Sequence, residues 1–171
     1  MGFDVYGKNP VIVKGTKEPE WPENYGELSD EEQSDYWNKK DEFQSKNPGT
    51  YFRASVWSWR PILDIITKEC SDLLDEKTLE GLAYNDGCGP DDQDTCTKMA
   101  ERIELFVKSF QRATKTEGFE LPSDMRVKDN GTLVSGDDKD WTGTRSAYSA
   151  DWDHIMEFCT FLRSCGGFKA C

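Results

Sequence analysis

The densest group of residues able to bind a ligand lies where an aromatic and basic segment meets a proline. Trp57, Trp59 and Arg60 come directly before Pro61, and Arg53 lies a few residues upstream. Indole rings stack on flat rings, and a guanidinium group adds a planar fork of donors that suits a phosphate. These residue types together predict a site for a small nucleotide-like ligand.

The same segment has a second interpretation, because large aromatic residues usually serve packing. In that case the two tryptophans belong to the core and Arg60 pairs with one of the many carboxylates. A proline disfavours helical backbone in the residue before it, so we expect Arg60 to be extended and a helix to begin at Pro61. Alternate residues of an extended segment share one side. Trp57 and Trp59 would therefore meet an arginine where the strand turns into the helix.

Other chemistry is poorly supported by the remaining motifs. The acidic runs at 91–94 and 137–140 lack the spacing of a calcium-binding loop and are better explained as helix caps and solvated loops. The chain has one histidine, His154, no Cys-x-x-Cys pair, no nucleophile motif and no phosphate-binding glycine loop. We expect neither a metal nor a cofactor, and we favour a non-enzymatic protein over an enzyme.

Length and charge limit the class of protein. The 171 residues suit one domain, and 33 acidic against 21 basic residues give a net charge of -12. Such a charge opposes direct contact with nucleic acid or anionic lipid. The amino terminus has no signal-peptide pattern and no apolar run reaches bilayer length, so we expect a cytoplasmic protein. In a reducing compartment the six cysteines should be free thiols.

The pattern of apolar residues, caps and turns predicts helices in four places and short strands near both ends. Ser29 with Glu32 forms a capping box before one helix, Ser149 is a candidate cap for the last, and Gly166-Gly167 should end it. The expected helices cover about 30–45, 61–74, 95–113 and 150–165, and the expected strands 3–5, 11–13, 126–134 as an Asn-Gly hairpin, and 168–171.

These elements indicate a single α+β domain in which about four helices pack on a small, mostly antiparallel sheet. The two terminal segments are candidates to pair in that sheet. Residues 16–50 should form a peripheral helical insert, and residues 118–144 an insert that contains the hairpin.

Several motifs in a fixed order resemble those of an uncharacterised family of small bacterial and tailed-phage proteins. They are Met1-Gly2-Phe3-Asp4-Val5-Tyr6-Gly7 with Asn9-Pro10, Tyr51-Phe52-Arg53, Val56-Trp57, Trp59-Arg60-Pro61, Asn85-Asp86-Gly87, and Gly166-Gly167-Phe168 with Cys171. Many members carry paired Cys-x-x-Cys motifs before the last helix, whereas this chain has no cysteine between Gly118 and Thr144.

The resemblance implies an accessory protein of phage type and adds Asn85 and Asp86, beside the Trp-Arg-Pro segment, to the expected ligand-binding residues. We therefore expect a binder of a small nucleotide-like ligand that acts as a counter-defence sponge for a host immune signal. One alternative is an acidic mimic of nucleic acid that occludes a basic surface of a host defence protein. A second alternative is a hydrolase. The sequence leaves the ligand, the partner and a homo-oligomer open.

Overall fold

Three antiparallel strands from distant parts of the chain form the main sheet. The computed structural model describes residues 2–121, 125–127, 133–135 and 146–171. The strand order is β2-β1-β7, with β1 at Gly2–Gly7, β2 at Tyr51–Ser55 and β7 at Phe168–Ala170. Val5 pairs with Phe52 on one side and with Ala170 on the other. The predicted pairing of the terminal segments is confirmed, and the α+β class with it.

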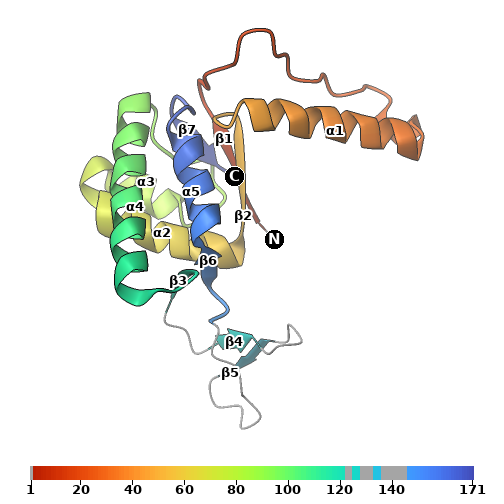
Figure 1. Cartoon of the computed structure of the whole chain (residues 1–171). Coiled ribbons are helices and arrows are strands. Elements are labelled where there is room, and N and C mark those ends of the chain that lie inside the picture. The colour runs from red at the N-terminus through yellow and green to blue at the C-terminus, as the bar shows by residue number, and fades with distance from the viewer. Residues whose placement is uncertain (1, 122–124, 128–132, 136–145) are drawn as a thin grey trace.

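Alternation along the strands divides the sheet into a buried face and an open face. Phe3, Val5, Phe52 and Ala54 are buried, whereas the residues between them are partly or fully exposed. The buried face packs on α2 (Val56–Cys70), α4 (Gln93–Thr114) and α5 (Trp152–Leu162), which lie together on one side of the molecule (Figure 1). These three helices therefore leave the other face of the sheet free.

Helix α1 spans Asp30–Lys46 and extends outward from the body, past the edge of the sheet (Figure 1). It begins with the predicted capping box: the Ser29 side chain accepts from the Glu32 amide, and the Glu32 carboxylate accepts from the Ser29 amide. A short 3-10 turn, η1 (Tyr25–Glu27), precedes it. Four rings, Trp21, Tyr25, Tyr36 and Trp37, pack on one another with centroids 4.4–6.5 Å apart. Residues 8–28, which join β1 to α1, are called the connecting segment below. This small aromatic cluster fixes that segment on α1.

Helix α2 begins five residues before the predicted position. The Ser55 side chain accepts from the Ser58 amide and starts the helix at Val56, so Arg60 is helical and not extended. Pro61 lies inside the helix, where it cannot donate to the Trp57 carbonyl. A good cap upstream has outweighed the bias that a proline imposes on the residue before it.

The segment 11–13 is not a strand, contrary to the prediction. The Val11 amide donates to the Ser164 carbonyl (2.8 Å) and the Val13 amide to the Asn47 side chain (2.7 Å). The chain therefore crosses the end of α5 and does not turn back on β1. Val11, Ile12 and Val13 are left 45–64% exposed.

The remaining elements are short. They are η2 (Ser71–Leu73), the unpredicted helix α3 (Glu76–Gly81), the pair β3 (Gly118–Glu120) with β6 (Ser149–Asp151), and the pair β4 (Met125–Val127) with β5 (Leu133–Ser135). The two strands of the predicted hairpin are confirmed, but its Asn-Gly turn lies outside the described residues. Ser149 is not the cap of the last helix, as predicted, because the β3–β6 pair holds it extended in β6. Asp151 is the residue that precedes α5. Gly166 and Gly167 have the expected positive φ, 63° and 88°.

Candidate functional site

The open face of the sheet carries polar and aromatic side chains in alternation. Asp4 and Tyr6 project from β1, Tyr51 and Arg53 from β2, and Lys169 from β7; we call these five residues the open sheet face. Tyr6 lies opposite Tyr51, with ring centroids 5.3 Å apart, and the Lys169 ammonium lies 5.9 Å from the Tyr6 ring centroid. Aromatic surface and positive charge are thus adjacent.

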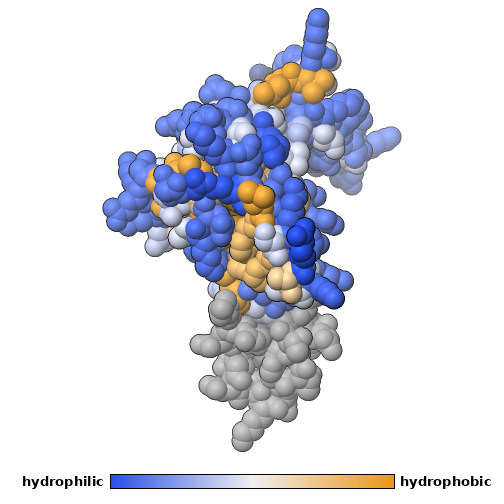
Figure 2. Space-filling model, turned by 60° about the vertical axis from the view of Figure 1, so that its left-hand side comes forward, coloured by the Kyte–Doolittle hydropathy of each residue, from blue (hydrophilic) through white to orange (hydrophobic). Residues whose placement is uncertain are grey.

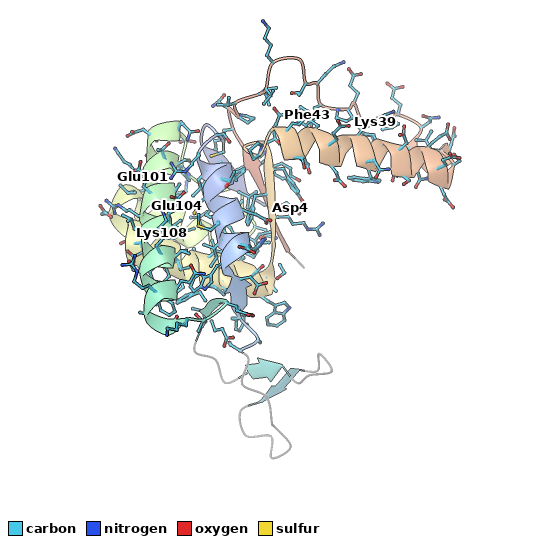
Figure 3. All side chains as sticks on the ribbon, in the orientation of Figure 1. Asp4, Lys39, Phe43, Glu101, Glu104 and Lys108 are labelled. Atoms are coloured by element: carbon cyan, nitrogen blue, oxygen red, sulfur yellow. The ribbon has the colours of Figure 1, made fainter. Side chains whose placement is uncertain are left out.

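Helix α1 and the segment before it turn this face into a groove of ≈ 560 Å³. Tyr6, Tyr51 and Arg53 form the sheet side, and Trp37, Lys40, Asp41 and Gln44 form the α1 side. Glu18 of the segment before α1 completes the lining, so two carboxylates face the same hollow as Lys40 and Arg53. Figure 3 shows Asp4 in the angle beneath α1, whereas Lys39 and Phe43 lie on the side of the helix that faces the connecting segment. We call this hollow the sheet–arm groove.

Tyr51 is tied to the sheet by its hydroxyl group, which donates a hydrogen bond to the Asp4 carboxylate. Partial burial raises the Tyr51 pKa far above its usual value, and the hydrogen bond to Asp4 and the negative charge of Asp4 raise it further. Burial, Asp4 and Cys171 also raise the pKa of Tyr6. Both phenols are therefore neutral donors at any physiological pH.

Replacing Asp4 should lower the Tyr51 pKa, because Asp4→Asn removes the negative charge that opposes phenolate formation. A raised folded-state pKa stabilises the fold below the unfolded value near 10, and this contribution is lost only as the pH rises through the folded value. We expect phenolate absorbance from Tyr51 to appear at lower pH in Asp4→Asn than in the wild type. Subtracting the titration of Tyr51→Phe isolates the signal, and an unchanged Tyr51 curve would contradict the assignment.

The cations of the site have few carboxylate partners. Many lysines of this chain have a close carboxylate, as in Lys39 with Asp35 at 2.6 Å. In the part of the chain that the structure describes, Lys40 and Lys169 have none within 4.0 Å, and Arg53 has only a 3.8 Å contact with Asp4. The Arg53 side chain is 70% exposed. These three charges remain available to an anion although the protein as a whole is acidic.

A larger hollow of ≈ 770 Å³ lies beside α5 and is lined by carboxylates without a lysine or arginine. His154 lines it, half-buried against Phe52 at a ring-centroid distance of 4.9 Å. Its acidic residues are Glu117, Asp151, Asp153 and Glu157. This hollow offers an anion no lysine or arginine, whereas the sheet–arm groove offers Lys40 and Arg53, so the groove is the better candidate.

The structure separates the residues of the predicted Trp-Arg-Pro site. Trp59 is fully buried, stacks on Phe3 at 5.2 Å and donates its indole N–H to the Leu82 carbonyl at 2.8 Å. Trp57 is 37% exposed and packs on Tyr148. Helical spacing, in place of the expected strand alternation, sends the two indoles in different directions. Trp59 is a core residue, as the packing interpretation held, and no ligand can stack on it here.

The polar loop of the expected site has a structural role in the sheet. The Asn85 side chain donates to the Gly2 carbonyl at 3.1 Å, and the Asp86 carboxylate accepts from the Cys88 amide at 3.3 Å. Gly2 also lies close to Arg53, since a Cβ atom on Gly2 would be 3.9 Å from the Arg53 Nε. Asn85 and Arg53 thus lie near the same end of β1, whereas Arg60 is half-buried in α2.

The cysteines do not add a second site. All six are free thiols, four of them buried, and burial raises the pKa of Cys70 and of Cys159 to about 12. Among the residues that the structure describes, no three His, Cys, Asp or Glu side chains are grouped so that they could hold a metal ion. No helix in the described ranges is long and apolar enough to cross a bilayer.

Sequence reasoning found Arg53 and missed the rest of the groove. Tyr6 lies in the opening motif of the resemblance but was not singled out as a site residue, and Trp37 and Lys40 come from a distant segment and belong to no motif. Lys169 beside the Tyr6 ring was not expected either. The one available signal was the alternation in β1 and β2, which puts Tyr6 and Tyr51 on the open side. Compared with protein-family models, curated proteins and solved structures, the chain has no match. Its function must be argued from this geometry.

Proposed function

We propose that the protein binds a small nucleotide-like ligand in the sheet–arm groove and does not change it chemically. The observation that carries the proposal is that Arg53 and Lys40 line the groove without a carboxylate closer than 3.8 Å, although Glu18 and Asp41 also line it, while Lys169 lies beside the exposed Tyr6 ring. Aromatic faces suit a base, and cations suit a phosphate. Because the net charge of the chain is -12, this grouping of cations does not follow from an excess of basic residues, and we attribute it to ligand binding.

The dimensions of the groove fit this class of ligand. Small-molecule sites usually have volumes of roughly 300–1,000 Å³, and the groove has ≈ 560 Å³. Tyr6 and Trp37 offer ring faces from the sheet and from α1, and each already has an ammonium group near its ring, Lys169 at 5.9 Å and Lys40 at 5.5 Å. A base between these walls would put its phosphate within reach of Arg53.

A protein that holds such a ligand without turnover would act by sequestration. That action agrees with the counter-defence role that we expect of an accessory protein of phage type, in which a host signal is withdrawn from its receptor. The strong negative charge would also keep the protein away from the nucleic acids of the cell.

The test is a thermal-shift screen against nucleoside monophosphates, cyclic mononucleotides and cyclic dinucleotides, followed by calorimetry. A ligand that binds only the folded state raises the melting temperature by mass action. We expect at least one of these classes to do so and to be recovered intact, as judged by mass spectrometry. Recovery of a cleaved ligand would instead support the hydrolase. No shift, together with a host protein that co-purifies and dissociates in high salt, would support the acidic mimic.

Arg53→Ala should weaken ligand binding by about tenfold to a hundredfold, the range expected when one charge-assisted hydrogen bond of about 1.5–3 kcal/mol is lost. Its effect on the free energy of unfolding should be about 1 kcal/mol or less, because the contact with Asp4 is exposed and long. Calorimetric titration of the ligand identified in the screen measures the loss.

Two variants serve as controls. Arg112→Ala removes an exposed arginine from α4 and should leave the affinity unchanged. Arg60→Ala tests the Trp-Arg-Pro site. If Arg60→Ala abolishes binding while Arg53→Ala has no effect, the ligand lies outside the groove.

A further inference from the structure

The two edge strands of the main sheet, β7 and β2, differ in whether their outward N–H and C=O groups have hydrogen-bond partners. The outer edge of β7 is covered by the chain at 87–90: the Phe168 amide donates to the Pro90 carbonyl, and Ala170 exchanges hydrogen bonds with Gly87 and Cys88, all at 2.9 Å. This segment ends the sheet on that side.

The outer edge of β2 has no such cover. Asp4 exchanges hydrogen bonds with Cys171 at 2.9 and 2.8 Å, so the backbone of Phe3 and Val5 points the other way, toward β2. Their partners Ala54 and Phe52 must point back, which leaves Tyr51 and Arg53 with outward N–H and C=O groups. None of these four groups bonds to any part of the chain that the structure describes.

An uncovered edge of this kind is a template for another strand. Edges are usually protected by a proline, a bulge, charged side chains or an inward-pointing charge. Of these, β2, Tyr-Phe-Arg-Ala-Ser with Phe52 and Ala54 inward, has only the exposed charge of Arg53. We propose that β2 pairs with β2 of a second copy of this chain, antiparallel and about a two-fold axis through Phe52, to give one continuous six-stranded sheet.

The side chains favour this register. With the axis at Phe52, Tyr51 of each copy lies opposite the partner's Arg53, so that both pairs place a guanidinium beside an aromatic ring. An axis at Arg53 would put the two arginines opposite each other, and an axis at Tyr51 would put Arg53 opposite the turn at Gly49. Of these three registers, only the Phe52 axis pairs the outward groups of Tyr51 with those of the partner's Arg53 and keeps the two arginines apart.

A second copy at this edge would continue the open sheet face beside the groove. Helix α1 points to the open side of the sheet (Figure 1), and its Trp37, 43% exposed, lines the groove there. Each groove would then gain the partner's Arg53 next to Tyr51. That last consequence rests on the proposed ligand site, whereas the pairing itself does not.

The pairing should be weak and should strengthen with salt. Only a few hydrogen bonds hold it, and each copy brings a net charge of -12. Added salt screens this repulsion, so sedimentation equilibrium should show a dimer whose dissociation constant falls as the ionic strength rises. Figure 2 shows another face of the molecule, on which hydrophilic residues surround a band of hydrophobic ones.

Two substitutions at one position separate the backbone from the side chain. Arg53→Ala keeps the outward N–H and should leave the dimer measurable, while it removes the arginine from the ligand groove. Arg53→Pro removes that N–H, which the fold itself does not use, and puts a ring on the edge. We expect Arg53→Pro to raise the dissociation constant of the dimer at least about tenfold above that of Arg53→Ala, since two of the four hydrogen bonds are lost.

Circular dichroism and melting curves establish that both variants fold, and hydrogen exchange of the wild type gives a second measurement. The Tyr51 and Arg53 amides should exchange more slowly as the protein concentration rises, whereas the Phe52 and Ala54 amides should be protected throughout. Concentration-independent exchange at Tyr51 and Arg53, a monomer at every concentration and salt, or equal dimerisation of the two variants would overturn the proposal. A monomer that binds ligand would refute the dimer alone, and a dimer that binds none of the nucleotides would refute the ligand site alone.

Discussion

Trp59→Ala is expected to lower the free energy of unfolding by about 3–5 kcal/mol, the usual cost of removing a large aromatic side chain from a core. Trp59 is fully buried, stacks on Phe3 and meets Phe158 edge to face at 5.8 Å. The substitution leaves a cavity and also leaves the Leu82 carbonyl without its indole donor. Chemical denaturation of both proteins measures the difference.

Trp57→Ala is the matched control, because Trp57 lies in the same helix and is 37% exposed. We expect it to cost about 1 kcal/mol, in line with partial loss of apolar contact. If Trp57→Ala proves as costly as Trp59→Ala, the assignment of Trp59 to the core is wrong. In the folded fraction of either variant, ligand affinity should equal that of the wild type.

Asn47→Ala should lower the free energy of unfolding by about 2–4 kcal/mol, since it leaves several buried polar groups without partners at about 1–3 kcal/mol each. The Asn47 side chain is fully buried, donates to the Phe43 carbonyl at 2.8 Å and accepts from the Val13 amide at 2.7 Å. It also donates a hydrogen bond to the Thr16 hydroxyl and accepts one from it. This one amide joins the connecting segment to the end of α1, so we expect faster proteolysis within 8–28 as well as lower stability.

Asn9→Ala provides the comparison for Asn47→Ala. Asn9 is exposed, and its side chain makes one long hydrogen bond of 3.4 Å to the Gly166 carbonyl. We expect a change of about 0.5 kcal/mol or less, which is usual for surface substitutions. Equal stability of Asn47→Ala and Asn9→Ala, with no change in proteolysis, would mean that the connecting segment is held by other contacts.

Local chemistry predicted the elements whose signals lie within a few residues. The Ser29–Glu32 box, the Asp92 cap of α4 and the two glycines after α5 all act over one turn of chain, and all three occur in the structure. The predicted start of α2 was wrong for a local reason too. Ser55 and Pro61 are both signals for the start of a helix, and the helix begins after the Ser55 cap.

The groove could not be predicted, because tertiary structure alone brings its walls together. Trp37 and Lys40 approach Tyr6 only after α1 has been fixed by Asn47 and by the crossing of the chain over the end of α5. The roles of Trp57 and Trp59 could not be predicted either. Their roles depend on whether residues 56–60 are strand or helix, since alternation and helical spacing send Trp59 to opposite environments.

The most direct test of the account is chemical-shift mapping of the backbone amides with the nucleotide that gives the largest thermal shift. We predict that the largest changes occur at residues 4–7, 37–44 and 50–53, on both walls of the sheet–arm groove, with small changes at residues 57–60 and 85–86. Changes centred on residues 57–60 and 85–86, with residues 4–7 and 37–44 unaffected, would contradict the central claim that the ligand site lies between the open sheet face and α1.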